Sequence, residues 1–149
     1  MTDCPPKMIG YWHHNHSVEG KRFPHPQDFV RRGWLDVGSH TALLHYLRSA
    51  SVFAVWRGLS WCRFRCGADD RAMGYREFWD GQWAWPEGLA HYVEHHHVVL
   101  PDEFVQRVIA GTQPPSLPKA SEPRAVDFEF WLDWTRKHSQ RPFWKFWKS

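Results

Sequence analysis

A two-cysteine turn, a hairpin pattern and a histidine-rich helix pattern follow one another in the middle of this sequence, and their order restricts how the chain can fold. Cys62 and Cys66 lie in WCRFRCG. Downstream, YREFWDGQWAW alternates aromatic and polar residues around Asp80-Gly81, which predicts a β-hairpin with a type I′ turn. The following segment, EGLAHYVEHH, predicts a helix that starts at Pro86 and runs to about residue 96. We therefore expect a cysteine knuckle, a hairpin and a helix, in that order.

Cysteine and histidine in this arrangement are typical ligands of a structural zinc ion. Such sites hold the metal in a tetrahedron of four side chains, often from a two-Cys turn and a two-His helix. The cysteines are spaced C-x3-C, and the histidines H-x3-H through His91 and His95 or H-x4-H through His91 and His96. Both histidine spacings lie within the range of zinc sites. Four protein ligands leave no position for water, so we expect zinc to stabilise the fold and not to catalyse.

The choice between His95 and His96 follows from helix geometry, in which each residue advances about 100° around the axis. On this projection His96 lies beside Leu89 and Val93 on the apolar side, whereas His95 lies with His91 on the opposite flank. A ligand that faces the hairpin and the knuckle should share the buried side, although His91 and His95 are the better-aligned pair. The predicted zinc ligands are Cys62, Cys66, His91 and His96, with His95 as the substitute for His96.

Metal-free interpretations of the same cysteines stay open. Cysteine often behaves as a small buried apolar residue, so Cys62 and Cys66 could be buried thiols. They could also close a small disulfide, or one of them could be a redox-active or catalytic thiol.

Composition restricts the class of protein. The 149 residues are 42% hydrophobic and 23% charged, which fits one globular domain. A mean hydropathy of −0.62, without an apolar run of about 18 residues, excludes an integral membrane protein. The first residues lack the apolar stretch of a secretory signal, and three cysteines cannot form a disulfide scaffold, so we expect a cytoplasmic protein. The 11 tryptophans indicate that aromatic rings supply much of the core.

The flanks of the central motif predict further helices and one strand. We expect a helix over 40–49 capped by Ser39, a strand over 51–56 and a helix from Pro101 to residue 110. Residues 112–125 contain four prolines and predict a linker or a strap over the surface. A short helix near 126–138, anchored by Trp131 among other aromatics, precedes the basic tail FWKFWK. The expected fold is a small zinc-stabilised α+β domain: a core over 1–111 centred on about 52–100, the linker 112–125, and a C-terminal helix and tail over 126–149.

Two segments, SWCRFRCG and WPEGLAHYVEHHHVVLPDEF, together with the opening GYW, resemble a family of small uncharacterised bacterial proteins. In that family a cysteine turn precedes a WPEGLxHYVxxH helix, and the resemblance covers about residues 8–110. The family's cysteines are usually spaced C-x2-C, so the C-x3-C spacing here departs from it. Its second histidine usually lies five residues after the first, which matches His96. The resemblance implies no activity, and the order of knuckle, hairpin and helix is also similar to the treble-clef zinc fold.

Two other clusters suggest different functions. His13, His14, His16 and His25 could assemble an open metal site that activates water, as in a metal-dependent hydrolase, and the spare His95 and His97 could serve the same purpose. Five arginines could contact phosphates, with nearby aromatic rings as stacking surfaces, as in a nucleic-acid-binding zinc protein. Those arginines are Arg57, Arg63, Arg65, Arg71 and Arg76, and acidic residues interrupt the same stretch.

The favoured interpretation is a zinc-containing binding module whose partner is another protein. The predicted ligand set is closed, and the surface motifs are rich in Trp and Arg, residue types enriched where protein interfaces gain most of their affinity. By this hypothesis the chain is an adaptor, an inhibitor or an immunity-type partner of a bacterial protein. The hydrolase and the nucleic-acid-binding protein are the alternatives.

Overall fold

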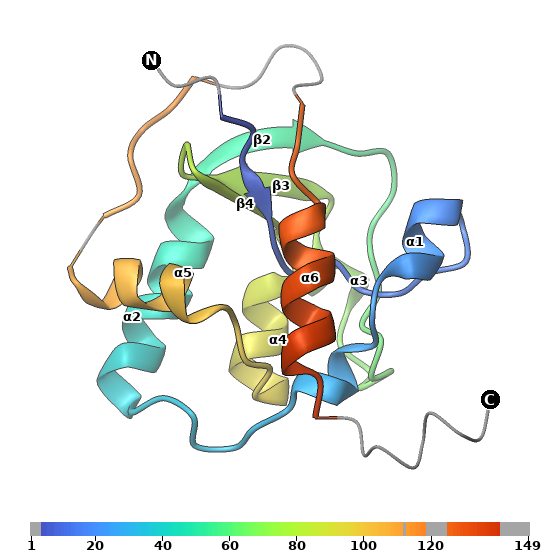
Figure 1. The fold of residues 1–149 in the computed structure, drawn as a ribbon, viewed down its shortest axis with the longest axis horizontal. Coiled ribbons are helices and arrows are strands. Elements are labelled where there is room, and N and C mark those ends of the chain that lie inside the picture. The colour runs from blue at the N-terminus through green and yellow to red at the C-terminus, as the bar shows by residue number, and fades with distance from the viewer. Residues whose placement is uncertain (1–3, 112, 119–124, 141–149) are drawn as a thin grey trace.

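The computed structural model describes residues 4–111, 113–118 and 125–140, which form a mixed α+β fold around a four-stranded sheet (Figure 1). The strand order is β1-β4-β3-β2. The short β1 (Lys7–Met8) is parallel to β4 (Trp83–Pro86), which is antiparallel to β3 (Arg76–Trp79). β3 is also antiparallel to β2 (Ser51–Val55). The α+β class expected from the sequence is therefore confirmed.

Helices pack below and beside the sheet (Figure 1). α2 (Val37–Ser49) contacts both α4 (Leu89–His96) and α5 (Asp102–Ile109), and α6 (Glu129–His138) contacts β1. Three short helices lie in the connections. They are α1 (Val18–Arg22), the 3-10 helix η1 (Pro26–Phe29) and α3 (Asp70–Met73).

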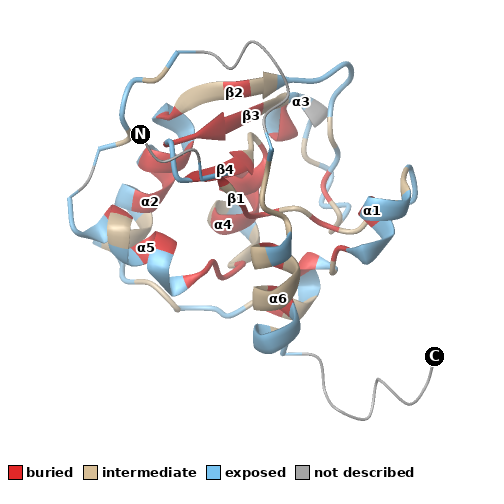
Figure 2. Cartoon of the chain, turned by 45° about the horizontal axis from the view of Figure 1, so that its top comes forward, coloured by how far each residue is buried: buried red, intermediate tan, exposed pale blue. Residues whose placement is uncertain are grey.

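Aromatic side chains fill much of the core, as the tryptophan content predicts. Trp85, Phe29 and Phe104 are completely buried, and Figure 2 shows buried residues concentrated in β3, β4 and the adjoining parts of α2 and α4. The ring of Trp12 contacts that of Trp131 in α6 at 5.2 Å between centroids. Trp131 is itself fully buried and donates a hydrogen bond from Nε1 to the carbonyl of Tyr11 at 2.7 Å. The C-terminal helix thus shares one core with the N-terminal segments.

The hairpin forms where the alternating pattern predicts it, but its turn is shifted by one residue. Asp80 pairs with Trp83, so the two loop residues are Gly81 and Gln82. Only Gly81 has a positive φ, which is typical of a type II′ turn and not of the predicted type I′ turn. The Asp80 carboxylate accepts from the backbone N–H groups of Gln82 and Trp83, and the buried Tyr46 hydroxyl donates to it at 2.6 Å. These bonds fix the Asp80 side chain inside the turn.

Two predicted helix starts are wrong. α2 begins at Val37, and its N-cap is Asp36 rather than Ser39, because the Asp36 carboxylate accepts from the Ser39 backbone N–H at 2.8 Å. Pro86 ends β4 instead of opening α4, which begins at Leu89. The pairing of the hairpin continues past Pro86, since the next N–H donates to the Arg76 carbonyl at 2.8 Å.

The proline-rich segment is described only over 113–118, where it has neither helix nor strand. It is tied to β2, because the Ser51 hydroxyl accepts from the Leu117 N–H at 2.7 Å and donates to the Pro115 carbonyl at 3.3 Å. The tail FWKFWK lies outside the described residues. Within the described ranges, no helix has the length and apolar character needed to span a membrane.

Candidate metal centre

The four predicted ligands lie together although they come from two separate segments of the chain. The loop after β2 supplies Cys62 and Cys66, and α4 supplies His91 and His96. The Cys62 Sγ lies 3.4 Å from Nε2 of His96, and the Cys66 Sγ lies 3.4 Å from Nε2 of His91. All four donor atoms lie within 4.8 Å of one another. Two sulfur and two nitrogen donors at this spacing could hold a metal ion.

The cysteine loop owes its shape to backbone bonds around a tight turn. The Arg65 N–H donates to the Cys62 carbonyl at 3.0 Å, and Arg65 itself has a φ of 52°. That left-handed conformation is uncommon for a residue with a side chain. Gly67, with a φ of 83°, then leads the chain away from the loop. The C-x3-C spacing therefore accommodates its third intervening residue by a left-handed turn, which brings both sulfur atoms to the same side.

Contacts with α4 and with the N-terminal segment hold the loop in place. The Arg63 N–H donates to the Tyr92 hydroxyl at 2.9 Å, and the Arg63 guanidinium donates to the His13 carbonyl at 3.2 Å. The ring of Phe64 stacks on that of His96 at 4.2 Å between centroids. The loop is thus fixed to the helix that carries the histidines by contacts that need no metal.

The end of α4 separates the adjacent histidines into different environments. His96 is the last helical residue, and its ring points to the cysteines, whereas His97 adopts a left-handed φ of 55° and caps the helix. His95 is exposed and lies 2.8 Å from the Glu94 carboxylate, which also pairs with Arg48. The structure therefore brings His96 and not its substitute His95 to the cysteines.

Burial favours the protonation state that suits histidine ligands. It lowers the pKa of both His91 and His96, and neighbouring histidines lower it further, so the neutral imidazole that can coordinate a metal predominates near pH 7. Burial raises the pKa of the Cys62 thiol, so a metal must displace its proton. Cys62 and Cys66 are free thiols and form no disulfide.

The other histidine cluster does not assemble into a comparable site. His13 stacks on His25, and His14 lies beside His16, with its Nδ1 accepting from the His16 backbone N–H at 3.3 Å. Within the described part of the chain, Cys62, Cys66, His91 and His96 form the one group of three or more such side chains able to hold a metal.

The arginines around the cysteine turn make varied contacts. Arg63 and Arg65 both lie over the ring of Trp61, at 4.6 and 5.9 Å. Arg76 forms an ion pair with Glu87 at 2.5 Å, which neutralises its charge. Of the five arginines, Arg63 and Arg65 therefore share one aromatic contact, whereas the charge of Arg76 is paired.

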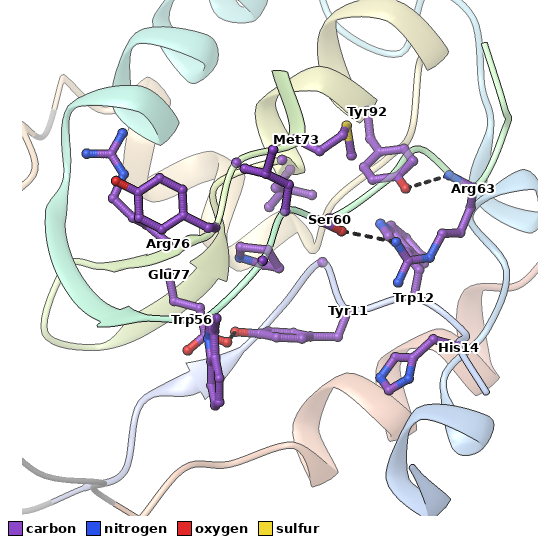
Figure 3. Close-up of a pocket in the computed structure, with 18 residues that line it drawn as sticks. Tyr11, Trp12, His14, Trp56, Ser60, Arg63, Met73, Arg76, Glu77 and Tyr92 are labelled. Carbon is purple, nitrogen blue, oxygen red and sulfur yellow. Dashed lines mark hydrogen bonds between the residues drawn. The ribbon is translucent and has the colours of Figure 1, made fainter. Parts of the chain in front are cut away.

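Sequence reasoning missed a second site, a cavity of about 290 Å³ beside the metal centre (Figure 3). Its wall contains Glu77 of β3, a carboxylate that is only 7% exposed and accepts from the Tyr11 hydroxyl at 2.7 Å. The available signal was the alternation of YREFW in the hairpin, which places Glu77 and the aromatic residues at fixed positions on the two faces of the strand.

Comparison with known proteins gives no match, since no family model, no curated protein and no solved structure matches this chain.

Proposed function

We propose that this protein is a zinc-containing binding module, in which a structural zinc ion joins the cysteine loop to α4 and a neighbouring aromatic surface binds another protein. The observation that carries the proposal is the cluster of four donor atoms from Cys62, Cys66, His91 and His96.

The donor set and its spacing support zinc. Zn–S bonds of about 2.3 Å and Zn–N bonds of about 2.0 Å, at tetrahedral angles, separate a sulfur from a nitrogen by about 3.5 Å. Two of the four sulfur-to-nitrogen distances here are 3.4 Å, from Cys62 to His96 and from Cys66 to His91, and all four donor atoms lie within 4.8 Å of one another. Two thiolates and two imidazoles are also a ligand set that zinc prefers.

A structural role follows from the number of protein ligands. Catalytic zinc sites keep one position for water or substrate, whereas four protein donors occupy the whole tetrahedron. The metal would also fix the loop between β2 and α3, a stretch from 56 to 69 that has no helix or strand of its own. A cytoplasmic location fits this role, because a reducing compartment keeps thiolates available as ligands.

The support for a binding role is a group of exposed apolar side chains next to the cysteine loop, which we call the aromatic surface. Trp56 is 61% exposed, and its backbone N–H donates to the carbonyl of Tyr75, another exposed aromatic. Exposed apolar patches often mark interaction sites, and Trp and Tyr are enriched at the residues that dominate binding energy. The aromatic surface consists of Trp56, Leu59 and Tyr75, which are exposed and line one cavity.

The structural role is tested by removing the metal from the full chain. A zinc chelator should lower the melting temperature by about 10 °C or more, because binding and folding are coupled at such sites. Added zinc should restore it. A melting temperature that does not respond to chelation would rule out a stabilising metal.

The binding role is tested by photo-crosslinking in the cells from which the protein comes. A benzophenone side chain in place of Trp56 should give a discrete adduct with one other protein. The same group in place of Lys137, an exposed residue of α6, is the matched control and should give none. Equal adducts from both positions, or none from Trp56, would contradict the assignment of the aromatic surface.

A further inference from the structure

We propose that the cavity beneath the aromatic surface binds an organic ammonium group, with Glu77 as the counter-charge and Trp56 and Tyr11 as its aromatic walls. This inference rests on the proposed binding role and names the chemistry that the surface recognises. It does not depend on the metal.

Glu77 lies in a buried environment without a paired cation among the described residues. Its carboxylate is only 7% exposed, and the side chains that donate to it, Tyr11 and Trp56, are neutral. Within the described part of the chain, no lysine or arginine forms an ion pair with Glu77. The two arginines that line the cavity with Glu77 have other partners, since Arg76 pairs with Glu87 and Arg63 donates to backbone and hydroxyl oxygens. A buried carboxylate without a cation is costly, and a cationic ligand would relieve that cost.

The wall of the cavity around Glu77 is mainly aromatic and apolar. Trp56, Tyr11 and Tyr75 line the cavity with aromatic rings, and Met73 and Leu89 add apolar surface. Aromatic faces attract ammonium groups through the quadrupole of the ring, and rings grouped around a carboxylate are a recurrent way to bind them. Figure 3 shows the Tyr11 ring extended along the cavity, with its hydroxyl directed to Glu77 and Trp56 beside it. An ammonium group at this end would contact both the charge and the rings.

The cavity also contains the positive charge of Arg63. The Arg63 guanidinium lies at the opposite end from Glu77, next to Ser60 and Tyr92 (Figure 3). It donates to the carbonyls of His13 and Trp61 and to the Ser60 hydroxyl, at 3.2, 2.7 and 3.2 Å. Arg76 also lines the cavity, but its charge is paired with Glu87, so the negative charge of Glu77 lies at one end and the positive charge of Arg63 at the other. A ligand with an ammonium group at one end and a hydrogen-bond acceptor some distance away, such as a lysine side chain and its backbone carbonyl, matches this polarity.

The ammonium group could come from a free amine or from a lysine of a protein partner, and the test separates these sources. We would titrate the zinc-loaded full chain with n-butylammonium and with the peptide acetyl-Gly-Lys-Gly-amide, following the indole N–H resonance of Trp56. Butanol and acetyl-Gly-norleucine-Gly-amide are the uncharged controls. We expect a dissociation constant of about 1 mM or tighter for at least one cation, which is a reasonable affinity for so small a ligand.

Saturable binding of both cations would identify a site for free amines, and binding of the peptide alone would identify a partner's lysine. The inference is wrong if neither cation binds, or if the uncharged controls bind equally well. Cross-linking at Trp56 without ammonium binding would leave the proposed function in place and overturn this inference alone.

Variants locate the binding site within the cavity. Glu77→Gln keeps the shape and an acceptor for the Tyr11 hydroxyl, and it should weaken cation binding by at least about tenfold. The matched control is Glu129→Gln, the same change at an exposed position of α6, which should leave the affinity unchanged. Trp56→Ala removes a ring that is 61% exposed and leaves the Glu77 carboxylate in place, so it provides a second test should Glu77→Gln fail to fold. Full affinity in both cavity variants would exclude this cavity as the ammonium site.

Discussion

The thiol sulfur of Cys62, in the loop after β2, lies 3.4 Å from Nε2 of His96, in the last turn of α4. The same separation joins Cys66 to His91, so each cysteine faces one histidine across a space of the size that a tetrahedral metal requires. Contacts of Arg63 and Phe64 with α4 place the loop against the helix independently of any ion. The polypeptide therefore places four side chains that could hold a metal ion close together without the ion.

Replacing Cys62 should destabilise the fold strongly. Cys62→Ser removes one of four ligands, and because metal binding contributes directly to folding, the melting temperature should fall by about 10 °C or more. Cys4→Ser is the matched control, since Cys4 is exposed and lies outside the cluster, and it should shift the melting temperature by less than about 2 °C. Calorimetry of both variants gives the comparison. Similar melting temperatures for the two would argue against a metal-coupled fold.

The two adjacent histidines should differ in their effect on metal affinity. His96→Ala removes a ligand and should weaken Co²⁺ affinity by more than about 100-fold. Loss of a residue that only hydrogen-bonds to a ligand already lowers metal affinity by about 10- to 100-fold. His95→Ala removes an exposed side chain paired with Glu94 and should change the affinity little. Titration with Co²⁺, followed by its visible absorption, measures both. The reverse order of effects would show that His95 is the ligand.

The pH dependence of stability should change when Glu77 loses its charge. Burial raises the pKa of Glu77, although hydrogen bonds from Tyr11 and Trp56 oppose that shift. The folded state therefore favours the protonated form. The protonated Glu77 carboxyl contributes stability below the ordinary pKa of 4.5, and this contribution is lost as the pH rises through the raised pKa. Glu77→Gln should consequently gain stability relative to wild type between pH 4 and 8, as measured by urea unfolding.

Glu87 should show the opposite dependence of stability on pH in the same urea unfolding experiment. Burial alone would raise the pKa of Glu87, but the hydrogen bonds from Arg76 and from the backbone N–H groups of Tyr75 and Arg76 lower it. Its contribution is present above the ordinary pKa and is lost as the pH falls through the lowered value. Glu87→Gln should therefore destabilise the protein at pH 7 and do so less at pH 3. If both variants changed stability in parallel with pH, the environments described for the two carboxyls would be incorrect.

Truncation of Trp131 tests whether α6 is part of the core. Trp131 is fully buried and bonded to the Tyr11 carbonyl, so Trp131→Ala should lower the free energy of unfolding by about 3 to 5 kcal/mol. Leu59→Ala, at a side chain that is 46% exposed, should cost less than about 1 kcal/mol. Equal losses in a denaturant titration would indicate that α6 does not pack as described.

Local sequence patterns predicted which cysteine and histidine side chains lie together, and also the hairpin, because both depend on spacing within short segments. The helical projection placed His96 on the apolar side with Val93, and the structure brings His96 to Cys62. The alternation of aromatic and polar residues predicted β3 and β4, although the fold buries the side chains on both faces of these strands, three of the four residues in each.

Features that depend on partners distant in the chain were not predictable in this way. The turn shifts to Gly81-Gln82 because the Asp80 carboxylate is held by Tyr46 in α2. Glu77 became a candidate site residue only when the fold placed Tyr11 against it, 66 residues away in the sequence. Pattern and propensity describe neighbours along the chain, whereas these two sites are formed by residues that only the tertiary structure brings together.

The central claim, a structural zinc held by two cysteines and two histidines, is tested most directly by the metal bound to untagged protein. Elemental mass spectrometry should find one zinc per chain in the wild type and in Cys4→Ser, and almost none in Cys62→Ser. X-ray absorption of the wild type should show two sulfur neighbours at about 2.3 Å and two nitrogen neighbours at about 2.0 Å. Wild-type protein that contains no zinc, or zinc that persists in Cys62→Ser, would contradict the account.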